Sequence, residues 1–150
     1  MRKLIAGGIV VGSLDITYAI LFWWFRGVAP TRVFQSVAAG VLGRDSFNLG
    51  MKSALLGAAL HYFIAFSIVI VYYLASKWLP VLIDHAVICG IVYGIGVYIV
   101  MNYVVIPLSN AARPKTFNLL WVSCSVIVHM FLIGLPAALF VRTARREDGL

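Results

Sequence analysis

Apolar residues form four long stretches along the chain, separated by shorter segments that contain most of the charged residues. The stretches cover about residues 4–25, 53–75, 87–106 and 117–141. A helix that crosses a bilayer needs roughly 20 apolar residues at 1.5 Å each, and every stretch is close to that length. Tryptophan and tyrosine residues stand at the ends of three stretches, as is typical of rings at a membrane interface. The pattern predicts an all-α protein with one domain, a bundle of four transmembrane helices.

The connection between the first two stretches is too long for a simple turn and has a pattern of its own. Pro30 is a plausible helix start, and apolar residues then recur on one helical face over residues 31–42. Arg32, Gln35 and Ser36 fall on the other side of this helix. We expect a short amphipathic helix that lies in the membrane interface, with a re-entrant gate or lid as the alternative.

Proline residues mark two irregular positions in the later stretches. Pro107 directly follows the third stretch and helps to separate it from the fourth, because proline cannot continue the helical hydrogen-bond ladder unaided. Pro136 falls inside the fourth stretch. Membrane helices tolerate such a proline when neighbouring groups satisfy the freed backbone, so its position predicts a kink.

Composition agrees with the membrane assignment. With 63% hydrophobic and 11% charged residues, the chain has too little polar surface to cover a soluble globule. The net charge of +7 comes from basic residues in the loops and at the ends. Anionic lipid headgroups, rather than nucleic acid, are therefore the expected counter-charge, and the lipid bilayer is the expected partner. We expect Arg26, Arg32 and Arg44 to contact headgroups.

Charge does not determine the orientation, because six basic residues fall on each side of a four-span topology. The side of the termini carries Arg2, Lys3, Lys77, Arg142, Arg145 and Arg146, and the other carries Arg26, Arg32, Arg44, Lys52, Arg113 and Lys115. The arginines after the fourth stretch directly adjoin a span. They favour cytoplasmic termini under the positive-inside rule.

Three ionisable residues lie at a comparable depth inside the stretches: Asp15 in the first, His61 in the second and His129 in the fourth. A charged side chain at the bilayer centre costs about 2.5–3.5 kcal/mol on insertion scales, so each should face protein or a water-filled cavity. In one bundle the three groups could meet near the midplane. Burial favours the neutral forms of a carboxyl and an imidazole, whereas proximity favours the ion pair, and a proton relay uses this balance.

Helix faces indicate where these groups point. Residues four and seven apart share a face, which places Asp15 and His61 on stripes of glycine and alanine. Such stripes let membrane helices approach closely, so both side chains are expected in a helix interface. His129 shares its more polar face with Ser125, and it too should point inward.

Two further polar residues extend this candidate site. Asn102 lies on the same face as Tyr98, several Å nearer to the long connection, where it could continue a polar path toward Tyr18. The candidate proton or substrate site is therefore made of Asp15, His61, His129, Asn102 and Tyr18. Asp15 is its main functional candidate, because an acid at that depth is a functional hypothesis by default.

Other roles for these residues stay open. His61, His129 and Asn102 could serve only as interhelical hydrogen-bond partners, which contribute about a kcal/mol in membrane bundles. His61 and His129 could be axial ligands of a haem, and with Asp15 they have the residue types of a two-histidine, one-carboxylate metal centre. Familiar enzyme signatures are absent from the sequence, so we expect no enzyme activity, no resident metal and no cofactor.

Part of the chain resembles a known family. The resemblance rests on Leu55–Phe63, Tyr72-Tyr73, Leu79-Pro80, Gly90–Gly94 and Ile106-Pro107, which together look like the YagU-like family of small bacterial inner-membrane proteins. It covers roughly the second and third stretches. It implies a bacterial inner membrane and several helices, and it supplies no catalytic residues.

The overall plan is also similar to that of the small multidrug resistance transporters, which have four spans with a carboxylate in the first and work as antiparallel dimers. Asp15 stands where they use glutamate, and the long basic first connection departs from their compact loops. This similarity implies an oligomer.

Two functions follow as hypotheses. The first is a small oligomeric proton-linked transporter or ion-conducting protein that uses Asp15. Four helices enclose little volume, so we expect a solute pathway to need a second protomer or a partner. The second is an accessory or assembly subunit of a larger membrane complex, suggested by the small-residue stripes.

Overall fold

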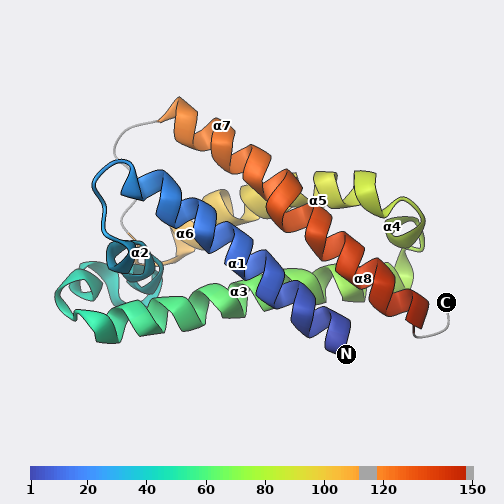
Figure 1. Cartoon of the computed structure of the whole chain (residues 1–150), viewed down its shortest axis with the longest axis horizontal. Coiled ribbons are helices and arrows are strands. Elements are labelled where there is room, and N and C mark those ends of the chain that lie inside the picture. The colour runs from blue at the N-terminus through green and yellow to red at the C-terminus, as the bar shows by residue number, and fades with distance from the viewer. Residues whose placement is uncertain (112–117, 148–150) are drawn as a thin grey trace.

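The computed structural model describes residues 1–111 and 118–147, and these residues form helices and connections without a strand. Four helices are long and apolar enough to cross a membrane: Arg2–Trp24, Met51–Trp78, Ala86–Leu108 and Leu119–Glu147. In Figure 1 they run between the end that carries both termini and the end that carries the connecting helix α2. The predicted all-α, four-span architecture is confirmed.

The third and fourth spans each consist of several helical segments, and short helices connect the spans. In chain order the elements are α1 (Arg2–Trp24), α2 (Pro30–Leu42), η1 (Gly43–Asn48), α3 (Met51–Trp78), α4 (Val81–Asp84), α5 (Ala86–Val100), η2 (Met101–Val105), α6 (Ile106–Leu108), α7 (Leu119–Val128), η3 (His129–Gly134) and α8 (Leu135–Glu147). The predicted start of the fourth span at residue 117 lies outside the described residues, as do Arg113 and Lys115. The helix observed there begins at Leu119, because the Asn118 side chain accepts a hydrogen bond from the Trp121 backbone N–H at 3.0 Å.

The two prolines coincide with π-helical turns. In the fourth span, η3 directly precedes the turn that contains Pro136, and in the third span η2 directly precedes Pro107. A proline ring displaces the carbonyl four residues earlier and brings no N–H to the ladder, so a wider turn is one way to relieve the clash. The irregularity expected at Pro136 is therefore a π turn. The third span does not end before Pro107 but continues to Leu108.

Helix α2 packs on α3 and carries a buried polar group toward it. The Gln35 side chain is 5% exposed, and its amide donates to the Gly50 carbonyl at 2.9 Å and to the Ser53 hydroxyl at 3.4 Å. The Ser46 hydroxyl donates to the Gln35 carbonyl at 2.9 Å. The predicted amphipathic helix exists, but the placement of Gln35 on its outer, polar face is wrong. The amide faces α3 because its partners lie there.

Glycines bring the spans into close contact. A Cβ atom added at Gly8 or Gly12 would overlap with the rings of Phe66 and Tyr62, which confirms the close approach of the first two spans. A Cβ atom at Gly94 would overlap with the backbone carbonyl of His129, so α5 lies against the fourth span. The first span also packs against the fourth, since a Cβ atom at Gly7 would lie 2.9 Å from the Phe140 Cβ.

Apolar side chains cover the outside of the bundle and fill one half of its inside. The outward faces carry large exposed residues, among them Leu55, Phe63, Val71, Ile88, Val92 and Phe131, so these faces contact the lipid bilayer. The buried core is formed by Val11, Ala65, Val69, Tyr72, Ala86, Val97, Ile133, Ala137, Ala138 and Val141. Most of these residues lie toward the end that carries the termini, and a cavity occupies the other half.

Candidate functional site

A cavity of about 250 Å³ lies between the spans. Its polar lining consists of Asp15, Tyr18, His61, Tyr98, Asn102, Ser125 and His129, and its apolar lining comes from all four spans and from Val37 of α2. All five residues of the candidate site predicted from the sequence thus face one space. The single chain encloses this cavity by itself, although we expected four helices to enclose little volume.

The first span and α3 hold Asp15 and His61 next to each other. The Nε2 atom of His61 lies 2.8 Å from the Gly12 carbonyl oxygen, and its Nδ1 atom lies 4.0 Å from the Asp15 carboxylate. A carbonyl oxygen only accepts hydrogen bonds, so Nε2 carries a proton and donates it. The Nδ1 atom of a neutral His61 is then unprotonated and faces the acid. The side chain of Asp15 is 30% exposed, as expected for a group at the wall of a cavity.

His129 has the opposite proton arrangement. Its Nδ1 atom lies 2.7 Å from the Ser125 carbonyl oxygen one turn earlier and donates to it, which leaves Nε2 without a proton in the neutral ring. The Tyr98 ring packs edge-on against the imidazole, with ring centroids 5.3 Å apart at 86°. Asp15 interacts electrostatically with His129 as well as with His61. The carboxylate of α1 therefore interacts with one histidine on α3 and one on the fourth span.

Uncharged polar groups complete the wall. Asn102 donates from Nδ2 to the Tyr98 carbonyl at 2.9 Å, which leaves the rest of its amide for the cavity. The hydroxyls of Tyr18 and Ser125 are buried and interact with each other, and within the described part of the chain neither makes a hydrogen bond of regular geometry. Such groups are costly to bury unless a water or solute pairs with them.

Sequence reasoning placed Ser125 on the face of His129 but did not include it in the site. Its position four residues before His129 was the available signal. At 3% exposure it is nearly inaccessible to bulk solvent, and it lines the same cavity. Only the packing of the first span against the fourth shows that Ser125 and Tyr18 meet there.

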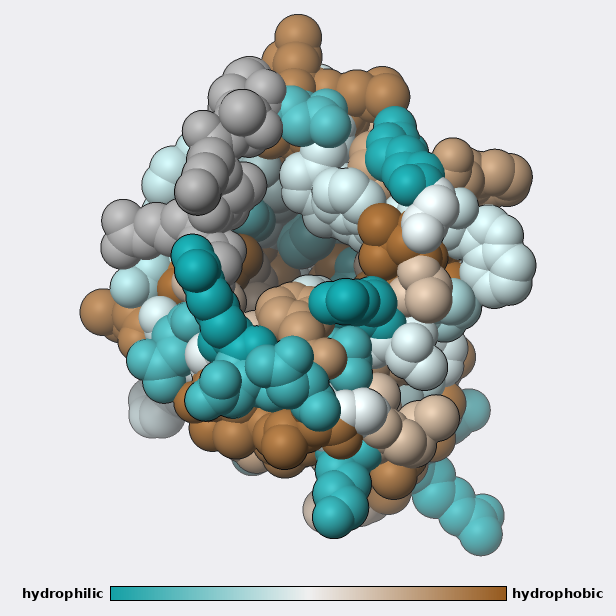
Figure 2. Space-filling view, turned by 90° about the vertical axis from the view of Figure 1, so that its left-hand side faces the viewer, coloured by the Kyte–Doolittle hydropathy of each residue, from teal (hydrophilic) through white to brown (hydrophobic). Residues whose placement is uncertain are grey.

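Aromatic rings gather at the end of the cavity that is nearer to α2. Trp121 stacks on Tyr18 with ring centroids 5.7 Å apart at 13°, and it also contacts Phe22 and Trp23 at 4.6 and 5.2 Å. Figure 2 looks onto this end of the molecule, and the face is hollowed at its centre. At the opposite end the cavity meets the buried core, because four residues belong to both the core and the cavity lining: Val11, Ala65, Val97 and Ile133. These four residues form a floor that closes the cavity toward the termini.

The alternative roles of His61 and His129, as ligands of a metal ion or a haem, make demands on the geometry of the cavity. Among the described residues, no group of three or more His, Cys, Asp or Glu side chains is close enough to hold a metal ion. Ligand pockets for drug-sized molecules measure roughly 300–1,000 Å³, and a haem between His61 and His129 would need more room than the 250 Å³ present. The cavity suits a proton, water molecules or a small solute better than it suits a porphyrin.

The arginines predicted to contact headgroups lie outside this site. Arg26, Arg32 and Arg44 are all exposed near the end that carries α2. Arg26 donates to the Phe22 carbonyl at 2.7 Å and stacks over the Phe22 ring at 3.7 Å, so it also caps the first span. Their contact with headgroups stays a prediction.

Comparison with protein-family models, with curated proteins and with solved structures finds no match to this chain.

Proposed function

We propose that this integral membrane protein is a small proton-linked transporter or ion-conducting protein whose cavity exchanges protons through Asp15. One observation carries the proposal: a carboxyl group and two imidazoles line a single cavity, and within the described residues each imidazole makes a hydrogen bond through only one of its nitrogens. Ionisable groups inside membrane spans typically mark ion paths and proton relays. Packing alone does not require three of them around one space.

In this proposal Asp15 passes a proton to either histidine. The 4.0 Å separation from Nδ1 of His61 exceeds a hydrogen bond, so transfer requires a bridging water or a small movement of the carboxyl. The titratable groups that face Asp15 are His61 from α3, His129 from η3, Tyr18 from its own helix and Tyr98 from α5. Transport should therefore depend on the protonation of this set and not on Asp15 alone.

Tyr18, Asn102 and Ser125 position the water or solute. Their hydroxyl and amide groups can offer the cavity hydrogen bonds beyond those made within the described residues. The apolar remainder of the lining keeps bulk water out and strengthens these interactions. The hollow at the α2 end and the apolar floor at the other end support access from one side in this conformation.

The proposal also includes the location and orientation of the protein. We propose a bacterial inner membrane because of the resemblance to the YagU-like family, and cytoplasmic termini because of the arginines that follow the fourth span. A homo-oligomer or a partner membrane protein would extend the pathway beyond the closed end of the cavity. An accessory role was suggested by small-residue stripes, but Gly8, Gly12, Gly94 and Gly134 make contacts within the chain, so no observation favours it.

Proteoliposomes test the proposal directly. Purified protein is reconstituted with a pH-sensitive dye inside, a potassium gradient with valinomycin sets the membrane potential, and proton flux is followed. Asp15→Asn should reduce flux to the level of protein-free liposomes, whereas Asp45→Asn, a neutralised acid in exposed η1, should match the wild type. Unchanged proton and cation flux in well-folded Asp15→Asn protein would refute the proposal.

A further inference from the structure

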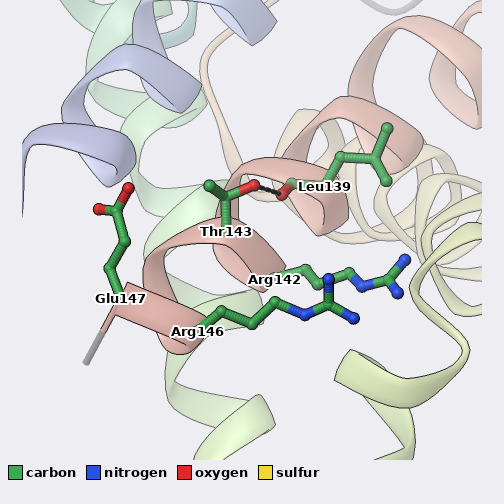
Figure 3. Close-up of a pocket in the computed structure, with 5 residues that line it drawn as sticks. All are labelled: Leu139, Arg142, Thr143, Arg146 and Glu147. Carbon is green, nitrogen blue, oxygen red and sulfur yellow. Dashed lines mark hydrogen bonds between the residues drawn. The ribbon is translucent and has the colours of Figure 1, made fainter. Parts of the chain in front are cut away.

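A second hollow lies at the opposite end of the molecule from α2, on the last turns of α8. It measures about 400 Å³ and is lined by Leu139, Arg142, Thr143, Arg146 and Glu147. It shares no lining residue with the central cavity. Figure 3 shows that Arg142 and Arg146 extend from α8 in the same direction. This groove therefore has a chemistry of its own.

The two arginines concentrate positive charge on one face of α8. They are four residues apart, so they lie on one face of the helix, where like charges repel. Among the described residues, neither has a carboxylate within salt-bridge distance, because Glu147 pairs with Lys3 at 3.4 Å. The Nε atom of Arg142 is buried and has no hydrogen-bond partner within that part of the chain. Both guanidinium groups are available to an anion.

The remaining lining residues indicate what kind of anion fits. Thr143 donates its hydroxyl to the Leu139 carbonyl at 2.9 Å, so it adds no donor to the groove (Figure 3). Leu139, one turn nearer to the centre of the span, is 39% exposed and supplies an apolar surface. From the centre of the span toward its end, the groove is thus first apolar and then cationic. A phospholipid has the same order from its acyl chain to its phosphate.

We propose that this groove is a specific site for an anionic phospholipid, with the phosphate held by Arg142 and Arg146 and an acyl chain along Leu139. Planar guanidinium groups match phosphate oxygens in pairs, which favours arginine at such sites. The site differs from the exposed arginines at the α2 end because it combines a hollow, two arginine side chains that extend in the same direction and an apolar wall. It is independent of transport through the central cavity.

Binding is measured on the full chain in detergent by native mass spectrometry or calorimetry, with short-chain phosphatidylglycerol, short-chain phosphatidylcholine and inorganic phosphate as separate probes. Wild-type protein should bind phosphatidylglycerol most tightly. The double variant Arg142→Gln with Arg146→Gln should bind it about 30-fold more weakly, since each basic residue near an anionic surface contributes about a five-fold factor. The double variant Lys52→Gln with Lys77→Gln removes the same charge from exposed positions outside the groove and should bind like the wild type.

The proposal would be overturned if the groove variant bound phosphatidylglycerol as tightly as the wild type. It would also be overturned if the control variant lost as much affinity as the groove variant, because the lipid would then be attracted by the overall charge and not by this groove. Inorganic phosphate binding as tightly as the lipid would overturn the lipid assignment. If the double variant does not fold, Arg146→Gln alone serves, since that side chain is exposed, and about five-fold weaker binding is expected.

Discussion

The contact between α5 and the fourth span can be tested with glycine-to-alanine substitutions. A Cβ atom at Gly90 would lie 2.8 Å from the Ala138 Cβ, 2.9 Å from the Gly134 carbonyl oxygen and 3.0 Å from the Leu135 Cα. Two of these three atoms belong to the backbone and cannot rotate away. The spans would have to separate by about half an ångström to restore ordinary contact, and overpacking of this kind costs about 1–3 kcal/mol.

The same helix offers a matched control. Gly96 has nothing within 4 Å of its Cβ position, so Gly96→Ala adds a methyl group to open space. Alanine is favoured over glycine in a helix by about 1 kcal/mol, and this gain applies equally to both variants. Gly90→Ala should therefore be less stable than Gly96→Ala by about 1–3 kcal/mol. Gly94→Ala should be worse still, because its Cβ meets the His129 carbonyl itself.

Reversible unfolding by sodium dodecyl sulfate in mixed micelles, followed by tryptophan fluorescence and circular dichroism, gives the free energies of unfolding. The expected order of stability is Gly96→Ala, then Gly90→Ala, then Gly94→Ala. If all three variants were equally stable, the close contact between the backbones of α5 and the fourth span would be refuted.

Three other predictions follow from buried polar groups. Gln35→Leu removes the hydrogen bonds that the amide donates to α3 and should lower the free energy of unfolding by about 0.5–1.5 kcal/mol and open the α2 segment to protease, whereas exposed Ser36→Ala should change little; equal cleavage of both variants would contradict the docking of α2. Tyr93→Phe removes a 2.8 Å hydrogen bond to the neighbouring span and should lower the free energy of unfolding by about 0.6–1 kcal/mol in the same assay, and no change would show that the bond is not formed. Nitrogen-15 NMR of the neutral rings should find the proton on Nε2 in His61 and on Nδ1 in His129, and the same tautomer in both would contradict the site geometry.

The sequence was sufficient for the helices and for the depth of the site. Apolar stretches of spanning length leave few alternatives, since backbone groups in lipid must be satisfied within a helix or a closed barrel. Counting along these helices placed Asp15, His61 and His129 at one level, and the structure puts all three on one cavity. Depth along a straight helix can be obtained from residue number alone.

Other features depended on partners that a helical pattern does not contain. Gln35 was placed outside because it is polar, yet Ser53 and the Gly50 carbonyl satisfy it inside. The tautomers of both histidines are set by backbone carbonyls, which every residue has and no sequence pattern marks. The π turn at η3 contains more residues per turn than an α-helix. A helical face assigned from a regular 100° rotation per residue is therefore displaced after this turn. Pro136 signalled an irregular turn but not its kind.

The first span is the helix that both histidine-bearing spans share as a neighbour. Gly12 of this span lies against α3, which carries His61, and Gly7 lies against the fourth span, which carries His129. The distance from Asp15 to each imidazole is therefore set by a direct helix contact and not through an intervening element. If the cavity exchanges protons as proposed, a change in the charge of Asp15 would act on both contacts at once.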